Sequence, residues 1–111
     1  MQPGDEVILP TLTIISCING IVKLGAKPVL VDCAKTSWNL DVEAVFGKIT
    51  ARTKAVLAVH VYEYACDMQG LQQVIRDAEE SAGGDRKIFL VEDNAELIGG
   101  SRRGRPTGSF G

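Results

Sequence analysis

The stretch that decides the fold is Lys87-Ile-Phe-Leu-Val-Glu-Asp-Asn-Ala-Glu-Leu-Ile-Gly-Gly100. Its first part, Ile88 to Val91, is a short apolar run rich in β-branched and aromatic residues, which predicts a buried strand. Two carboxylates, Glu92 and Asp93, stand at the carboxyl end of that strand, where the ligand crevices of parallel sheets open. Because side chains alternate along a strand, only one of the two can face a given crevice.

Asp93 is the main candidate for a functional carboxylate. Glu96 lies three residues further on and returns to the same side if the chain turns helically there. Each residue also has a simpler explanation: Asp93 as a turn former after the strand, and Glu96 as a solvated acid. His60, the only histidine, ends an earlier predicted strand. A hydrogen-bonded structural histidine, with Asp93 or Asp32 as its partner, is commoner there than a base or metal ligand.

Upstream of the opening stretch, apolar strands alternate with amphipathic helices, and this order indicates a single α/β domain with a parallel sheet between two helical layers. Asp41 and Asp67 are the expected N-caps of the second and third helices, and Thr11 or Thr13 that of the first. The broad apolar face of the first helix predicts that it is buried. The predicted strands are 6–9, 27–32, 54–60 and 88–91, the predicted helices are 14–24, 42–49 and 68–82, and residues 101–106 are predicted to form a polar hairpin.

Composition excludes several classes of protein. The 111 residues carry 12 lysines and arginines against 14 aspartates and glutamates, a balance that favours neither nucleic acid nor an anionic membrane. The longest apolar run is far shorter than the roughly 18 residues that a membrane helix needs. The three cysteines have no metal or redox spacing, which indicates small packed residues in a reducing compartment, the cytoplasm. With a single histidine, no metal cluster or Ser-His-Asp triad can be assembled.

A series of ordered blocks covers nearly the whole chain and resembles the DegT/DnrJ/StrS family of sugar aminotransferases. The Thr13–Cys17 and Ala95–Gly100 runs are most similar to the GDP-perosamine synthase branch of that family. The blocks are Pro3-Gly-Asp-Glu-Val-Ile-Leu-Pro-Thr-Leu-Thr13, Gly25-Ala-Lys-Pro-Val-Leu-Val-Asp32, Trp38-Asn-Leu-Asp41, Thr53-Lys-Ala55, Val59-His-Val-Tyr62, Asp67-Met68, Val91-Glu-Asp-Asn-Ala-Glu96 and Gly108-Ser-Phe-Gly111.

The resemblance implies a cofactor, pyridoxal 5′-phosphate (PLP), held on the large domain of the type I PLP-dependent transferase fold. Asp93 matches the aspartate that pairs with the pyridine nitrogen, which keeps the ring protonated and able to accept electrons. Glu96 matches a position near the ring oxygen. Ile14 stands where many members place an aromatic residue over the ring. His60 matches a histidine to which we assign a supporting role.

The resemblance also implies that the chain is a fragment of that domain. The family's Schiff-base lysine follows the Gly108–Gly111 block, and its phosphate-binding turn precedes the first strand, so both are expected outside residues 1–111. None of the lysines present matches the Schiff-base position, which leaves the chain without a catalytic residue of its own. We therefore expect the 111-residue chain alone to be inactive.

The function implied is transfer of an amino group from an amino acid, typically glutamate, to a keto carbon of a nucleotide-linked deoxysugar, in a cytoplasmic homodimer. One alternative within the family is a PLP-dependent sugar dehydratase, in which a histidine replaces the lysine. A second alternative, from another class, is a non-catalytic α/β module that binds an anion or a partner through Asp32, Asp93 and the cluster Arg102–Arg105.

Overall fold

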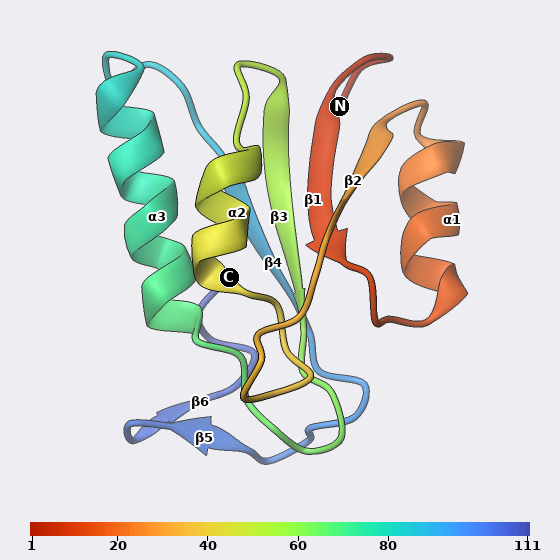
Figure 1. Cartoon of the computed structure of the whole chain (residues 1–111), viewed down its shortest axis with the longest axis vertical. Coiled ribbons are helices and arrows are strands. Elements are labelled where there is room, and N and C mark those ends of the chain that lie inside the picture. Colours follow the sequence, from red (N-terminus) through yellow and green to blue (C-terminus); the bar gives the residue numbers. More distant parts are fainter.

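Four parallel strands form the sheet of this computed structural model, which describes residues 1–111. They lie in the order β2-β1-β3-β4, with β1 and β3 in the centre (Figure 1). Their pairing is parallel throughout, which confirms the predicted sheet. The strands are β1 (Glu6–Pro10), β2 (Lys27–Val31), β3 (Thr53–Val59) and β4 (Phe89–Asp93).

Strand β4 is longer than predicted, because it continues through Glu92 and Asp93. Its register against β3 pairs Ala58 with Glu92 and Val59 with Asp93. The two carboxylates are therefore part of the ladder, and their backbone positions are set by β3. The prediction that the carboxyl ends of β3 and β4 lie side by side is confirmed.

Helices cover both faces of the sheet, so the predicted three-layer arrangement is confirmed. Helices α2 (Val42–Lys48) and α3 (Met68–Ser81) lie over one face, and α1 (Ile15–Lys23) lies over the other (Figure 1). The side chains of Asp41 and Asp67 accept hydrogen bonds from the first turns of α2 and α3, as predicted. None of these helices has the length and apolar character required to cross a bilayer.

The core is divided unequally by the alternation of the strands. A cluster of 12 buried residues, including Ile8, Val56 and Leu71, packs between the sheet and the α2–α3 layer. Only five buried residues, including Leu9 and Ile21, form the cluster under α1. The sheet is therefore well covered on one face and thinly covered on the other.

The prediction that the first helix is buried was wrong. Of its residues only Ile21 is buried, whereas Ile15 is 65% and Val22 56% exposed. The helix lies beside the edge strand β2, so it has neighbours on one side only. The prediction that Thr11 or Thr13 caps this helix was wrong too. Ile14 is the N-cap residue, and no side chain forms a capping hydrogen bond there.

The chain ends with the predicted hairpin and a loop that returns to the sheet. Strands β5 (Ser101–Arg102) and β6 (Arg105–Pro106) pair antiparallel. Arg103 and Gly104 both have positive φ, as a tight two-residue hairpin turn requires. The segment that follows, residues 108–111, lies against β4.

Candidate functional site

A small cavity of about 290 Å³ opens at the carboxyl edge of the sheet, on the α1 side. Asp93 contributes a carboxylate to it from the last position of β4, opposite Val59 of β3. Most of the lining is apolar, so the carboxylate faces a largely hydrophobic space. The lining residues are Leu12, Thr13, Ile14, Val59, Val61, Tyr62, Asp93, Ala95 and Glu96.

Asp93 has few partners within the chain. Its Oδ1 accepts a hydrogen bond from the backbone N–H of Ala95 at 3.0 Å, which forms a local turn after the strand. The thiol of Cys17 donates to its Oδ2 at 3.4 Å, and Thr13 Oγ1 in turn donates to the Cys17 sulfur at 3.3 Å. No lysine, arginine or histidine forms an ion pair with Asp93. The carboxylate is therefore available to a positively charged group of a ligand.

Glu96 returns to the same side as Asp93, as the spacing predicted, and both line the cavity. Its Oε2 accepts a hydrogen bond from the backbone N–H of Tyr62 at 2.9 Å. Tyr62 and Glu63 have φ values of 51° and 67°, and Val61 bridges to Tyr64 across this tight turn. Such backbone is costly for residues other than glycine, so the surroundings must hold it.

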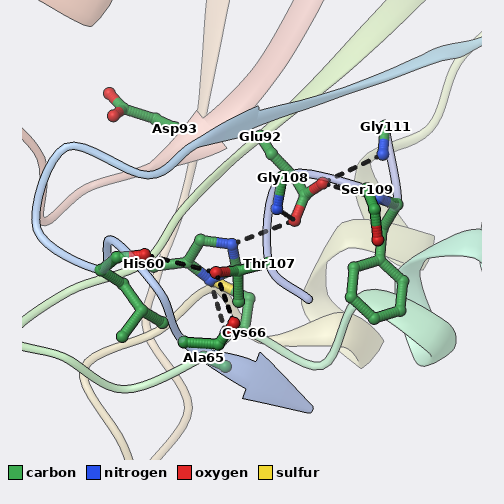
Figure 2. A network of polar contacts seen from close by, with 12 residues as sticks. His60, Ala65, Cys66, Glu92, Asp93, Thr107, Gly108, Ser109 and Gly111 are labelled. Carbon is green, nitrogen blue, oxygen red and sulfur yellow. Dashed lines mark hydrogen bonds and ion pairs between the residues drawn. The ribbon is translucent and has the colours of Figure 1, made fainter. Parts of the chain in front are cut away.

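Glu92, the neighbour of Asp93, faces the opposite side of the sheet and closes a hydrogen-bonded network with His60 (Figure 2). Its Oε1 lies 3.2 Å from His60 Nε2. It also accepts three backbone N–H groups: Gly108 at 3.0 Å, Phe110 at 2.7 Å and Gly111 at 3.1 Å. We call Glu92, His60, Gly108, Phe110 and Gly111 the Glu92 network. Figure 2 shows Asp93 pointing away from it.

The predicted partner of His60 was wrong, because Glu92 takes the place expected for Asp93 or Asp32. His60 Nδ1 accepts the backbone N–H of Cys66 at 2.9 Å, so it carries no proton and Nε2–H donates to Glu92. Both ring nitrogens are thus engaged, and the side chain is fully buried. In this geometry neither ring nitrogen of His60 is free to face the cavity.

Two pKa values in and beside the Glu92 network are shifted. Burial raises the pKa of the Glu92 carboxyl, but the N–H groups of Gly108 and Phe110 and the His60 ring outweigh it, so the net pKa is lowered. Burial raises the pKa of the Cys66 thiol to about 12. The thiol therefore stays protonated at neutral pH and donates to the Val59 carbonyl at 3.0 Å.

The residues of the proposed anion-binding module do not come together. Asp32, Asp93 and Arg102 line three separate cavities. Asp32 accepts the backbone N–H of Cys33 at 2.9 Å, while Arg102 pairs with Asp67 at 3.5 Å. Because β2 and β4 are the two outer strands, the acids at their tips are held apart by the width of the sheet.

Sequence reasoning missed the Glu92 network and the contact between Cys17 and Asp93. A partial signal for the network was the pair of glycines in the last block. A Cβ on Gly111 would lie 2.8 Å from the Leu90 carbonyl oxygen, and Gly108 has a φ of +86°. Glycines that allow close backbone approach indicate that residues 108–111 pack tightly on another element, although not on which one.

A parallel αβα sheet with a carboxylate in an apolar cavity at its carboxyl edge is the arrangement in which α/β domains bind ligands. The chain belongs to the DegT/DnrJ/EryC1/StrS aminotransferase family, whose model matches residues 1–111. Members of this family use PLP. The resemblance to this family that the sequence blocks indicated is confirmed.

Curated relatives include GDP-perosamine synthases. That of Escherichia coli O157:H7 is 39% identical over 111 residues, which are 100% of this chain and 28% of the relative. That of Vibrio cholerae is 44% identical over 108 residues, covering 97% of this chain and 27% of the relative. The chain thus spans between a quarter and a third of the length of these proteins.

Solved structures share the fold. Spr1654 from Streptococcus pneumoniae, assigned as a sugar aminotransferase and solved in its PLP form, is 30% identical with a TM-score of 0.88, over 98% of this chain and 30% of that one. A GDP-4-keto-6-deoxymannose-3-dehydratase is 26% identical with a TM-score of 0.86, over 99% of this chain and 26% of that one. The fold is therefore common to an aminotransferase and a dehydratase.

Proposed function

We propose that residues 1–111 form part of the PLP-binding large domain of a sugar aminotransferase, with Asp93 facing the cofactor's ring nitrogen. The observation that carries the proposal is the Asp93 carboxylate, which lies in an apolar cavity and forms no ion pair with a lysine, arginine or histidine. The complete enzyme would move an amino group from an amino acid, typically glutamate, to a keto carbon of a nucleotide-linked deoxysugar.

The cavity fits the ring of such a cofactor. Its volume of about 290 Å³ lies just below the roughly 300–1,000 Å³ of small-molecule pockets. That is room for one substituted aromatic ring and not for a nucleotide sugar. No lysine or arginine lines the cavity, so these residues account for the ring end of the cofactor and not for its phosphate.

Each lining residue has a role that follows from its chemistry. Asp93, as a carboxylate, would keep the ring nitrogen protonated. Bound PLP would supply an electron sink when an amino-acid carbon loses its proton. Ile14 would pack on the ring face through dispersion, without aromatic stacking. Glu96, which lines the same cavity, would approach the ring oxygen, and His60 would support the site from the other face of the sheet.

Binding of a cofactor analogue tests the proposal. Pyridoxine 5′-phosphate lacks the aldehyde and therefore cannot react with surface lysines. Asp93→Asn should weaken its binding by about tenfold, because the charge-assisted hydrogen bond to the ring nitrogen is lost. Asp85→Asn, the same change at an exposed residue, should leave the affinity unchanged. Equal affinity of Asp93→Asn and the unaltered chain would refute the assignment.

The chain alone is proposed to be inactive, because none of its six lysines lines the cavity. The test is to incubate the purified chain with PLP, glutamate and a nucleotide-linked 4-keto-6-deoxysugar, and to measure 2-oxoglutarate. We expect no more than PLP alone produces. Formation above that level would contradict the proposal.

The dehydratase remains the second candidate, because the fold matches the structure of such an enzyme. The product separates the two in an assay of the complete enzyme: an aminotransferase places nitrogen on the sugar, and a dehydratase removes a hydroxyl. The exposed apolar side chains of α1 support the proposed homodimer, in which this face would be covered. The three free cysteines suit the reducing cytoplasm, which we propose as its location.

A further inference from the structure

We propose that Glu92 and His60 are positioning residues, which fasten the segment 108–111 to the sheet and hold the loop 61–66 that forms one wall of the Asp93 cavity. The part of this inference that concerns ligand affinity rests on the proposed function. The structural part stands on the Glu92 network alone. The two residues thus act on the cavity from the opposite face of the sheet.

The first step is the attachment of segment 108–111. Three of its backbone N–H groups donate to one carboxylate whose side chain is only 4% exposed. Phe110 is buried in the larger core cluster, and its carbonyl accepts a hydrogen bond from Gln72 of α3 at 2.7 Å. The segment is therefore held between β4 and α3, with the Glu92 charge as its main polar anchor.

The second step links the same carboxylate to the loop. Glu92 orients the His60 ring through Nε2, and the ring holds the loop through the Cys66 N–H. Asn39 supports the loop too, because Val61 N–H donates to its Oδ1 and its Nδ2 donates to the Tyr64 carbonyl. The loop thus has buried hydrogen-bond partners on the closed side of the sheet and Glu96 on the cavity side.

The third step is the consequence for the cavity. Tyr62, which lines the cavity, has a left-handed backbone that is unfavourable for a tyrosine. A strained conformation persists only where its surroundings determine it. Loss of the His60 contact should therefore let Tyr62 move, and the wall should become mobile although no cavity residue has been changed.

The experiment compares Glu92→Gln with Glu80→Gln, the same change at an exposed residue of α3. An amide cannot accept four donors as the carboxylate does. We expect amide hydrogen exchange to become about tenfold or more faster at Gly108, Phe110 and Gly111 and in residues 61–66. Amides of Ile8 and Leu9 in the central strand report on global unfolding, and their rates should rise less than those of the two segments. Glu80→Gln should change nothing.

His60→Gln separates the attachment of segment 108–111 from the attachment of the loop 61–66. It also replaces Glu92→Gln in the experiment if that variant fails to fold. The glutamine Nε2 can still donate to Glu92, but it leaves the Cys66 N–H without an acceptor. Exchange should then accelerate in residues 61–66 and not in 108–111. Unchanged exchange in the loop for this variant would overturn the link through His60. Unchanged exchange in both segments for folded Glu92→Gln would overturn the whole proposal.

Affinity for pyridoxine 5′-phosphate provides the functional readout. Under conditions in which the variants are folded, Glu92→Gln and His60→Gln should weaken binding severalfold, with faster exchange in the loop. Asp93→Asn should weaken binding without faster exchange. If the unaltered chain does not bind the analogue, the proposed function fails while the exchange results still decide the positioning role. Binding by His60→Gln equal to that of the unaltered chain would overturn the effect on the cavity.

Discussion

The two faces of the sheet at its carboxyl edge give neighbouring carboxylates opposite environments. On the α2–α3 side the Glu92 side chain is only 4% exposed and accepts four hydrogen bonds. On the α1 side Asp93 has one backbone donor and a thiol, and its cavity opens between exposed apolar side chains. Alternation along one strand turns the two carboxylates to opposite faces, and the elements packed on each face make the two environments different.

The difference shows how a site can be both open and ordered. An unpaired carboxylate contributes little to stability, but it is available to a ligand. Its position must then be fixed from elsewhere, and in this chain the β4 backbone and the Glu92 network beneath it do so. Under the proposed function, stability and binding are thus divided between two adjacent residues.

The largest expected effect comes from removing Glu92. Glu92→Ala leaves three backbone N–H groups and the His60 ring without their acceptor, and it should lower the free energy of unfolding by about 3–5 kcal/mol. Asp93→Ala should change it by only about 0.5 kcal/mol. Urea unfolding monitored by circular dichroism measures both. Equal losses would remove the distinction between the two faces.

A smaller effect is expected from the apolar layers. Leu71 of α3 is fully buried, so Leu71→Ala should cost about 2–5 kcal/mol. Leu24, at the end of α1, is exposed, and Leu24→Ala should cost about 0.5 kcal/mol or less. The same unfolding measurement applies. A comparable loss at Leu24 would mean that α1 is covered in solution, for example in a dimer.

Acid should weaken the α2–α3 face of the sheet, which we call the closed face because segment 108–111 and α3 cover it. Because the folded-state pKa of Glu92 is lowered, its contribution is complete above the ordinary glutamate pKa of about 4.3 and is lost as the pH falls through the lowered value. Glu6 behaves similarly, because the Thr50 hydroxyl and Arg52 lower its pKa. Unfolding free energies between pH 3 and 6 should therefore fall less steeply for Glu92→Gln than for the unaltered chain. Identical slopes would contradict the role of the Glu92 charge.

The last prediction involves no loss of stability. Cys66 is fully buried with its pKa raised to about 12, whereas Cys17 and Cys33 are partly exposed. Iodoacetamide at neutral pH should modify Cys17 and Cys33 and spare Cys66 until the protein is unfolded. Mass spectrometry of the peptides measures this. Labelling of native Cys66 would show that the closed face opens readily.

Much of the architecture could be predicted from local patterns. Apolar runs of strand length, the capping residues Asp41 and Asp67, and the hairpin at 101–106 were all confirmed. The position of Asp93 at an open strand tip was predictable too, because parallel sheets bind ligands at that edge. These features depend on interactions between residues close together in the chain or on rules general to the fold.

The rest depended on contacts between distant residues. The partner of His60 lies 32 positions away, and the donors to Glu92 lie 16 to 19 positions away. The exposure of α1 depends on its place beside an edge strand, which helical periodicity does not reveal.

By itself the sequence determined the order of strands and helices, the family, and the fact that Glu92 and Asp93 face opposite ways. Only the tertiary structure decided which carboxylate is buried and which one faces the cavity. The physical reason is that alternation sets relative orientation, whereas burial is set by the elements that pack on each face. Here the segment 108–111 and α3 close one side, and the other stays open.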